Sequence, residues 1–223
     1  MSETDFPIRH SLNNDTPAEL VPEKIKPFMS LMVYYQCALY ELETKLKVLN
    51  TEFSATHNRN PIQSIKSRIK KPLSILEKLQ RKGLPITADS IEKHLNDIAG
   101  LRVVCSFPDE IYQLAIMLST QDDIKVIEVK DYIKNPKPNG YRSLHLILEI
   151  PIFLSNQKRY VRAEVQFRTI AMDFWASLEH QMKYKKKISD PEAIAKELKD
   201  CADKIALLDD RMQNLRDKIQ QEE

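Results

Sequence analysis

The chain has 223 residues, of which 42% are hydrophobic and 30% are charged. This length fits one domain with elaborations or at most two small domains, and the hydrophobic fraction is enough for a real core. A net charge of +2 argues against a protein that coats nucleic acid through its bulk charge, so a bound polyanion would need cations gathered locally.

Glycine and cysteine usage excludes further classes. The three glycines are Gly83, Gly100 and Gly140, and their spacing matches neither the GxGxxG nor the GxxxxGK[ST] phosphate loop, so side chains must hold any phosphate. Cys37, Cys105 and Cys201 are far apart and lack metal-ligand spacing, which indicates reduced thiols in a cytoplasmic protein. No apolar run approaches the ~20 residues of a bilayer-spanning helix, and the N-terminus lacks a signal-peptide core, so we expect no membrane contact.

Long helices are predicted near both ends. Residues 1–24 are polar and without periodicity, which predicts a flexible arm ahead of a domain over residues 25–223. Apolar residues then recur at steps of three and four from Ile25 to Phe53 and again from Ile194 to Ile219, with Pro191 near the start of the second helix. The two apolar seams could pack within the chain or between subunits, and the sequence does not separate these alternatives.

Between these helices the periodicity changes. Residues 64–70 alternate and place Lys66, Arg68 and Lys70 on one face of a strand. Two short helices follow, one that ends at Gly83 and one that begins after Thr87 as its N-cap. Further strands are predicted at 101–107, 124–132, 143–150 and 160–168, with helices at 108–121 and 169–185. This order predicts a single α/β domain with a mixed sheet of about five strands flanked by helices.

The last predicted strand has one fully polar face. This face consists of Tyr160, Arg162, Glu164, Gln166 and Arg168. A central strand of an α/β domain usually buries both faces, so the polar row indicates either a lined cleft or an antiparallel strand that faces water. If strands 143–150 and 160–168 form a hairpin, His145 joins the same face, which favours the cleft.

The segment NPKPNGYRSLH predicts a rigid turn. Pro138 fixes φ, and Asn139-Gly140 allows a tight reversal, so Tyr141 would leave the turn with little freedom.

Two acids and a set of cations carry the candidate chemistry. Asp97, at the end of a predicted helix, and Glu164, in a strand, match a Mg²⁺ site that substrate phosphates complete. The alternative is that each acid is an ordinary ion-pair partner, for example Asp97 with Arg102. Cations in and beside strands are costly unless anions compensate them, which favours a side-chain phosphate clamp. These cations are Lys66, Arg68, Lys70, Lys78, Arg81, Arg102, Lys130, Lys137, Arg142 and Arg168.

Three segments resemble a known family. DIAGLRVVCSF, VKDYIKNPKPNGYRSLH and AEVQFRTIAMDFWASLEH are similar to the synthetase domain of the RelA/SpoT homologues, and most of all to small alarmone synthetases of the RelP and RelQ type. The resemblance runs from about Ile25 to the C-terminus and implies a nucleotidyltransferase-like synthetase fold without a hydrolase half. Asp173, where some RelQ-like chains have Asn, favours the RelP type.

The family resemblance implies an activity. Such enzymes transfer the β,γ-pyrophosphate of ATP to the 3′-OH of GDP or GTP in the stringent response, and AMP leaves. The matching ATP-binding residues are Arg68, Lys70, Ser74, Lys78, Arg81, Arg102 and Arg168. The matching GDP- or GTP-binding residues are Lys130, Lys137, Asn139, Tyr141 and His145, with the Tyr141 ring stacked on guanine. The catalytic residues are Glu164, which would activate the 3′-hydroxyl, Asp97 and Gln166, and the two acids would hold Mg²⁺.

The resemblance also implies a homotetramer built through the terminal helices, and single-stranded RNA is a further candidate partner. Two other functions stay open at this point: a module that binds a nucleotide or single-stranded RNA without turnover, and another nucleotidyltransferase. The paired acids argue against the first, because they would repel a polyanion unless a metal ion lay between them.

Overall fold

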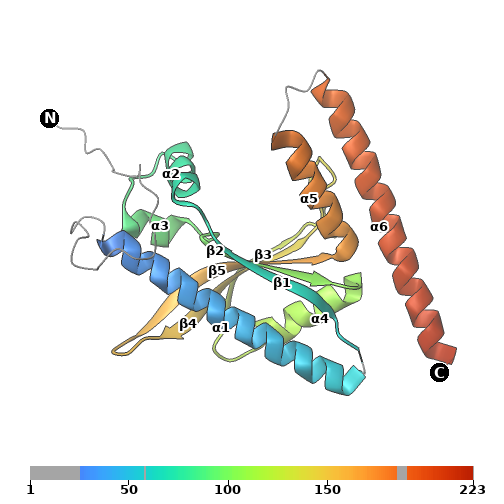
Figure 1. Ribbon diagram of the computed structural model, residues 1–223, viewed down its shortest axis with the longest axis horizontal. Helices are drawn as coiled ribbons and strands as arrows, with labels where there is room; N and C mark the ends of the chain where they lie inside the picture. The colour runs from blue at the N-terminus through green and yellow to red at the C-terminus, as the bar shows by residue number, and fades with distance from the viewer. Residues whose placement is uncertain (1–25, 58, 185–189, 223) are drawn as a thin grey trace.

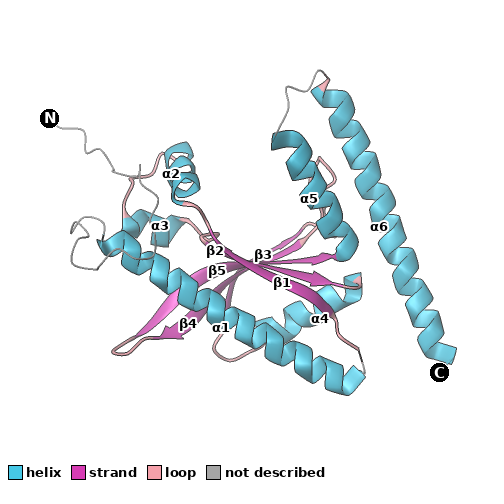
Figure 2. Ribbon diagram, viewed as in Figure 1, coloured by secondary structure: helices cyan, strands magenta, loops and turns pink. Residues whose placement is uncertain are grey.

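The computed structural model describes residues 26–57, 59–184 and 190–222. The predicted flexible arm over residues 1–24 lies outside this part of the chain. The helices and strands follow one another in the predicted order (Figure 1, Figure 2). They are α1 (Lys26–His57), β1 (Ile62–Ile69), α2 (Pro72–Arg81), α3 (Ala88–His94), β2 (Ala99–Cys105), α4 (Pro108–Ser119), β3 (Lys125–Asp131), β4 (Leu144–Phe153), β5 (Lys158–Thr169), α5 (Ile170–Tyr184) and α6 (Pro191–Glu222).

The sheet is mixed and has five strands in the order β1-β2-β5-β4-β3. β2 and β5 run parallel, whereas the other neighbours are antiparallel. β5 is therefore the central strand, and it places Glu164 beside Gly100 of β2 and beside Ile147 of β4. The prediction of a single α/β domain with a mixed sheet is confirmed.

The apolar face of the sheet carries the core. The side chains of α1 that pack there follow the predicted seam and include Tyr35, Leu39, Leu42, Leu46, Leu49 and Phe53, all buried. α4 lies on the same side, and α2 and α5 rise from the other side (Figure 1). The first apolar seam thus packs within the chain, and the polar face of the sheet is left between α2 and α5.

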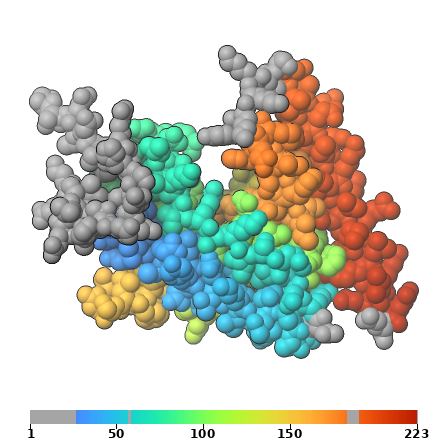
Figure 3. All heavy atoms as spheres, viewed as in Figure 1, coloured from blue at the N-terminus to red at the C-terminus, as the bar shows by residue number. Residues whose placement is uncertain are grey.

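The second apolar seam, on α6, is only partly buried within the described chain. α6 lies along α5 (Figure 1, Figure 3), and Leu198 of the seam is buried while Trp175 donates a hydrogen bond to its carbonyl. Toward the C-terminus, polar contacts hold the helix, because Arg216 donates two hydrogen bonds of 2.8 and 2.9 Å to Asp109. Four later seam residues are exposed within the described chain, each by half or more: Leu208, Met212, Leu215 and Ile219.

Local details refine the predicted boundaries. Thr87 caps α3 as expected, since its side chain accepts a hydrogen bond from the Ser90 amide. However, α3 ends at His94 because Leu95 adopts an extended backbone, so Asp97 lies in the loop before β2 and not at a helix end. The cysteines are free thiols, as predicted. None of the helices in the described residues is both long and apolar enough to span a membrane.

Candidate active site

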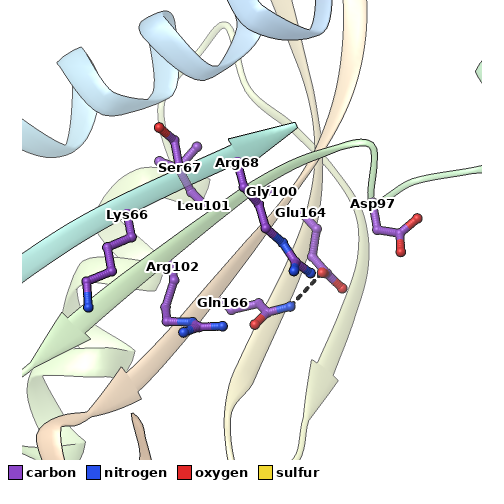
Figure 4. Close-up of a pocket in the computed structure, with 9 residues that line it drawn as sticks. All are labelled: Lys66, Ser67, Arg68, Asp97, Gly100, Leu101, Arg102, Glu164 and Gln166. Carbon is purple, nitrogen blue, oxygen red and sulfur yellow. Dashed lines mark hydrogen bonds between the residues drawn. The ribbon is translucent and has the colours of Figure 1, made fainter. Parts of the chain in front are cut away.

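The polar face of β5 forms part of a cleft. The cleft encloses about 450 Å³ of space that is open to solvent, and the surface is hollowed between α2 and α5 (Figure 3). Figure 4 shows the lining side chains, which come from β1, β2, β5 and the loop before β2. They are Lys66, Ser67, Arg68, Asp97, Gly100, Leu101, Arg102, Glu164 and Gln166. Of the two interpretations of the polar strand face, the lined cleft is confirmed.

Asp97 sits between two lysines. Its Oδ2 lies 2.9 Å from the Lys70 Nζ and 2.7 Å from the Lys78 Nζ, so its ion-pair partners are not the Arg102 considered above. Burial alone would raise the pKa of Asp97, but the hydrogen bonds from Lys78 and Lys70 outweigh it and hold that pKa below its usual value. The other carboxylate oxygen, Oδ1, is buried and accepts no hydrogen bond from the described residues.

Both oxygens of Glu164 are engaged. Oε1 lies 3.1 Å from the Nδ1 of His145, and Oε2 accepts a hydrogen bond of 2.7 Å from the Gln166 amide (Figure 4). The Arg68 guanidinium also points toward this carboxylate (Figure 4). Burial would raise the pKa of Glu164, yet the contacts with His145 and Gln166 lower it overall. Glu164 is therefore ionised at neutral pH and can accept a proton.

Arg168 follows Gln166 by two residues on β5, and it is only 5% exposed. It donates hydrogen bonds to the Tyr141 hydroxyl, the Gln166 side-chain oxygen and the Asp173 carboxylate. Asp173 also pairs with Arg102, at 3.2 Å. Burial and the charge of Arg168 lower the pKa of Arg102. Sequence reasoning used Asp173 only as a mark of subtype and missed its contact with two arginines, because nothing in the spacing relates α5 to β2.

The predicted rigid turn is present. Gly140 has a φ of +90° and donates a hydrogen bond of 2.8 Å to the Lys137 carbonyl. The Lys137 Nζ lies 4.8 Å from the centroid of the Tyr141 ring and 4.6 Å from that of Tyr132. Tyr141 and His145 are hydrogen-bonded at 2.8 Å. Three predicted guanosine-nucleotide residues (Lys137, Tyr141 and His145) therefore lie together, next to Glu164.

Other predicted site residues make different contacts. On α2, Ser74 is half-buried and Arg81 is exposed, and neither lines the cleft. Lys130 pairs with Glu128 at 3.0 Å. Asn139 accepts a hydrogen bond from the Tyr141 amide and donates one to Glu179, so it fixes the turn against α5.

The acids fit a divalent metal ion as a partial ligand set. Within the described residues, no group of three or more His, Cys, Asp or Glu is arranged to hold a metal. Mg²⁺ commonly takes one or two carboxylates and fills its other positions with substrate phosphates and water. Asp97 offers a buried oxygen that accepts no hydrogen bond from the described residues, and Glu164 lines the same cleft.

A mixed sheet whose polar face gathers arginines, lysines and acids indicates a protein that binds phosphate groups, because arginine and lysine form charge-assisted hydrogen bonds with them. Comparison with known proteins gives the family. Residues 67–189 match the family model described as "Region found in RelA / SpoT proteins", and the chain belongs to this family.

Similar proteins agree with this family. The chain is 46% identical over 188 residues to the GTP pyrophosphokinase YwaC of Bacillus subtilis, covering 84% of this chain and 90% of the relative. The crystal structure of small alarmone synthetase 2 from B. subtilis is similar at a TM-score of 0.78 and 43% identity, covering 86% and 98% of the two chains. Small alarmone synthetase 1 from B. subtilis, bound to its product pppGpp, is similar at a TM-score of 0.79 and 36% identity, covering 87% and 99%.

Proposed function

We infer that this chain is a (p)ppGpp synthetase, which transfers the β,γ-pyrophosphate of ATP to the 3′-OH of GDP or GTP and releases AMP. The similar proteins are named as GTP pyrophosphokinase or small alarmone synthetase, and one of them holds pppGpp. The observation that carries the proposal is the position of an ionised Glu164 between two sets of residues. The cations of β1 and β2 lie on one side, and the Tyr141 turn lies on the other. We expect synthesis without hydrolysis.

The cations would act on the donor nucleotide. Pyrophosphoryl transfer needs positioning and charge neutralisation more than covalent catalysis. Arg68 and Arg102 line the cleft and can hold the phosphates of ATP, while Lys70 and Lys78 flank Asp97. A bound Mg²⁺, held by Asp97 and Glu164, would supply further neutralisation of the phosphate charge.

Residues on the other side would act on the acceptor. Stacking of a base on an aromatic ring such as that of Tyr141 contributes about 1–3 kcal/mol. A ribose hydroxyl is a poor nucleophile, so a carboxylate within hydrogen-bond reach assists by accepting its proton. The lowered pKa of Glu164 keeps it ionised and available for this role.

Substitution of Glu164 tests the proposal. Glu164→Gln retains the shape and can keep the contact with Gln166 but removes the base and the acceptor for His145, so we expect loss of AMP and ppGpp formation in a chain that still unfolds in a single cooperative transition. Glu149→Gln is the matched control, because Glu149 lies on the same sheet face and pairs with Arg162. Turnover of the Glu164 variant near that of the control would rule out the proposed base.

We also propose that the exposed seam of α6 is buried in a homotetramer. The support is its four exposed apolar side chains, since contiguous apolar surface of this kind commonly marks an interface. Light scattering of the purified protein would give the assembly mass. The cytoplasmic location, single-stranded RNA as a partner and the RelP type stay predictions.

A further inference from the structure

Glu164 and four other side chains form a closed ring of hydrogen bonds. One arm runs from Arg168 to the Tyr141 hydroxyl (2.8 Å), on to the His145 Nε2 (2.8 Å), and from the His145 Nδ1 to Glu164 (3.1 Å). The other arm runs from Arg168 to the Gln166 Oε1 (3.0 Å), and from the Gln166 Nε2 to Glu164 (2.7 Å). Both arms begin at one guanidinium nitrogen of Arg168, and they end on different oxygens of one carboxylate.

The direction of each hydrogen bond follows from the groups involved. A guanidinium can only donate, so the Tyr141 oxygen accepts from Arg168. The only other hydrogen-bond contact of this hydroxyl within the described residues is the His145 Nε2, which therefore accepts the hydroxyl hydrogen. The Nδ1 of His145 then carries the ring hydrogen and donates it to Glu164. The reverse direction would leave the Tyr141 hydroxyl hydrogen without an acceptor in this part of the chain.

The ring is held rigidly. Arg168 and His145 are 5% and 6% exposed, and Asp173 fixes Arg168 from behind with a contact of 2.9 Å. His145 and Gln166 are direct partners in the β4–β5 ladder, so their backbone positions are fixed relative to one another. Tyr141 is the one member outside the two strands. Its side chain therefore links the turn to the carboxylate.

We propose that the hydroxyl of Tyr141 is a positioning group for Glu164, acting through His145, in addition to the stacking role of the ring. The inference rests on the proposed function, because it assumes that Glu164 accepts the proton of the acceptor hydroxyl. The residue that binds the base and the residue that activates the 3′-OH are thus one hydrogen-bonded unit. Removal of the hydroxyl leaves the aromatic platform for the base intact, but the His145 imidazole loses the hydrogen bond that orients it at Nε2 and so holds the Glu164 carboxylate less firmly.

Tyr141→Phe separates these two roles. We expect its KM for GDP to stay within about twofold of the wild type, because the aromatic ring of the side chain remains. Its kcat should fall about 10- to 100-fold, because misplacement of a reacting group by about 1 Å can cost 100-fold. In contrast, Tyr141→Ala should also raise the KM for GDP, by about 5- to 150-fold from the lost stacking.

Tyr132→Phe is the matched control. The Tyr132 ring packs edge-on against Tyr141 and His145, at centroid distances of 6.1 and 5.2 Å, but its hydroxyl makes no hydrogen bond to the described residues. Loss of this hydroxyl should leave both kcat and KM unchanged. An unfolding transition at the wild-type position would show that each variant is folded.

Two substitutions of His145 test whether its contact with Glu164 or its contact with Tyr141 matters more for turnover. An Asn amide can take the place of Nδ1–H and donate to Glu164, whereas a Gln amide reaches toward the position of Nε2. We therefore expect His145→Asn to retain a kcat at least fivefold above that of His145→Gln, and an equal or reversed order would contradict the view that the Tyr141 hydroxyl acts on turnover through the contact of His145 with Glu164.

The outcomes also separate this inference from the function on which it rests. A wild-type chain that forms no AMP from ATP and GDP would overturn both. An active wild type with a Tyr141→Phe variant of equal kcat, or one in which only the KM for GDP changes, would overturn the positioning role alone.

Discussion

Gly140 provides the sharpest test of how the turn is positioned against α6. Its φ of +90° lies in a region that side chains rarely adopt, and an added Cβ would lie 2.6 Å from the Ala202 Cβ and 3.2 Å from the Lys199 Cα. Gly83 also has a positive φ, of +65°, but an added Cβ there would meet nothing within 4 Å. Both glycines therefore have a backbone conformation that disfavours a side chain, but only Gly140 also lacks the room for one.

The expected magnitudes follow from this difference. Gly83→Ala should lower the free energy of unfolding by about 1 kcal/mol, the approximate cost of a left-handed backbone for a residue with a Cβ. Gly140→Ala should add an overpacking cost of about 1–3 kcal/mol, because the backbone of α6 cannot move aside as a flexible side chain can. The total loss at Gly140 is then about 2–4 kcal/mol, measured by urea unfolding.

A second substitution tests the cause. Ala202→Gly removes the methyl group nearest to the added Cβ, although glycine in a helix costs about 1 kcal/mol by itself. In the double variant, Gly140→Ala should be at least about 1 kcal/mol less destabilising than it is alone. If Gly140→Ala costs no more than Gly83→Ala, or if Ala202→Gly gives no recovery, the close packing of turn and helix is not the reason for glycine at this position.

Three further substitutions probe the site and the fold. Asp97→Asn should lower kcat by about 100-fold through the loss of charge at the phosphate site, measured as AMP release, and a loss below threefold would exclude a direct role. Asp173→Asn should lower the free energy of unfolding by about 1–3 kcal/mol, because Arg102 and Arg168 lose a charged partner; an unchanged urea midpoint would contradict this. Burial raises the pKa of Asp209, so its contribution to stability is complete below the pKa of the unfolded chain and is lost as pH rises through the folded-state value. The difference between the thermal midpoints of Asp209→Asn and the wild type should therefore change in favour of the variant as the pH rises above about 4, and a constant difference would contradict the raised pKa.

Much of the fold was predictable because the periodicity of apolar residues changes clearly along the chain. The seam of α1 and the alternation in β5 each record which side chains face the core. The packing of α6 was not predictable in the same way. Its seam has the same period as that of α1, yet Leu208 and Met212 stay exposed, and contacts such as Arg216 with Asp109 hold the helix.

The candidate site was predictable in its composition but not in its contacts. The polar row of β5 indicated a cleft, because alternation in a strand assigns each side chain to a face. Asp97 lies in the loop before β2, Lys70 directly follows β1, and Lys78 is in α2. Their contacts depend on how these three segments pack, which the spacing of residues along the chain does not show. The ring around Glu164 likewise depends on the β4–β5 register and on side-chain orientations, which arise only when the strands pair.

The central claim is tested most directly by the products formed from ATP, GDP or GTP and Mg²⁺ with the purified chain. The proposed function predicts AMP and a guanosine nucleotide that carries a new pyrophosphate on its 3′-oxygen, in equal amounts. Free pyrophosphate in place of AMP would indicate ordinary nucleotidyl transfer. Nucleotide binding without any AMP would indicate a binding module, and either result would contradict the assignment as an alarmone synthetase.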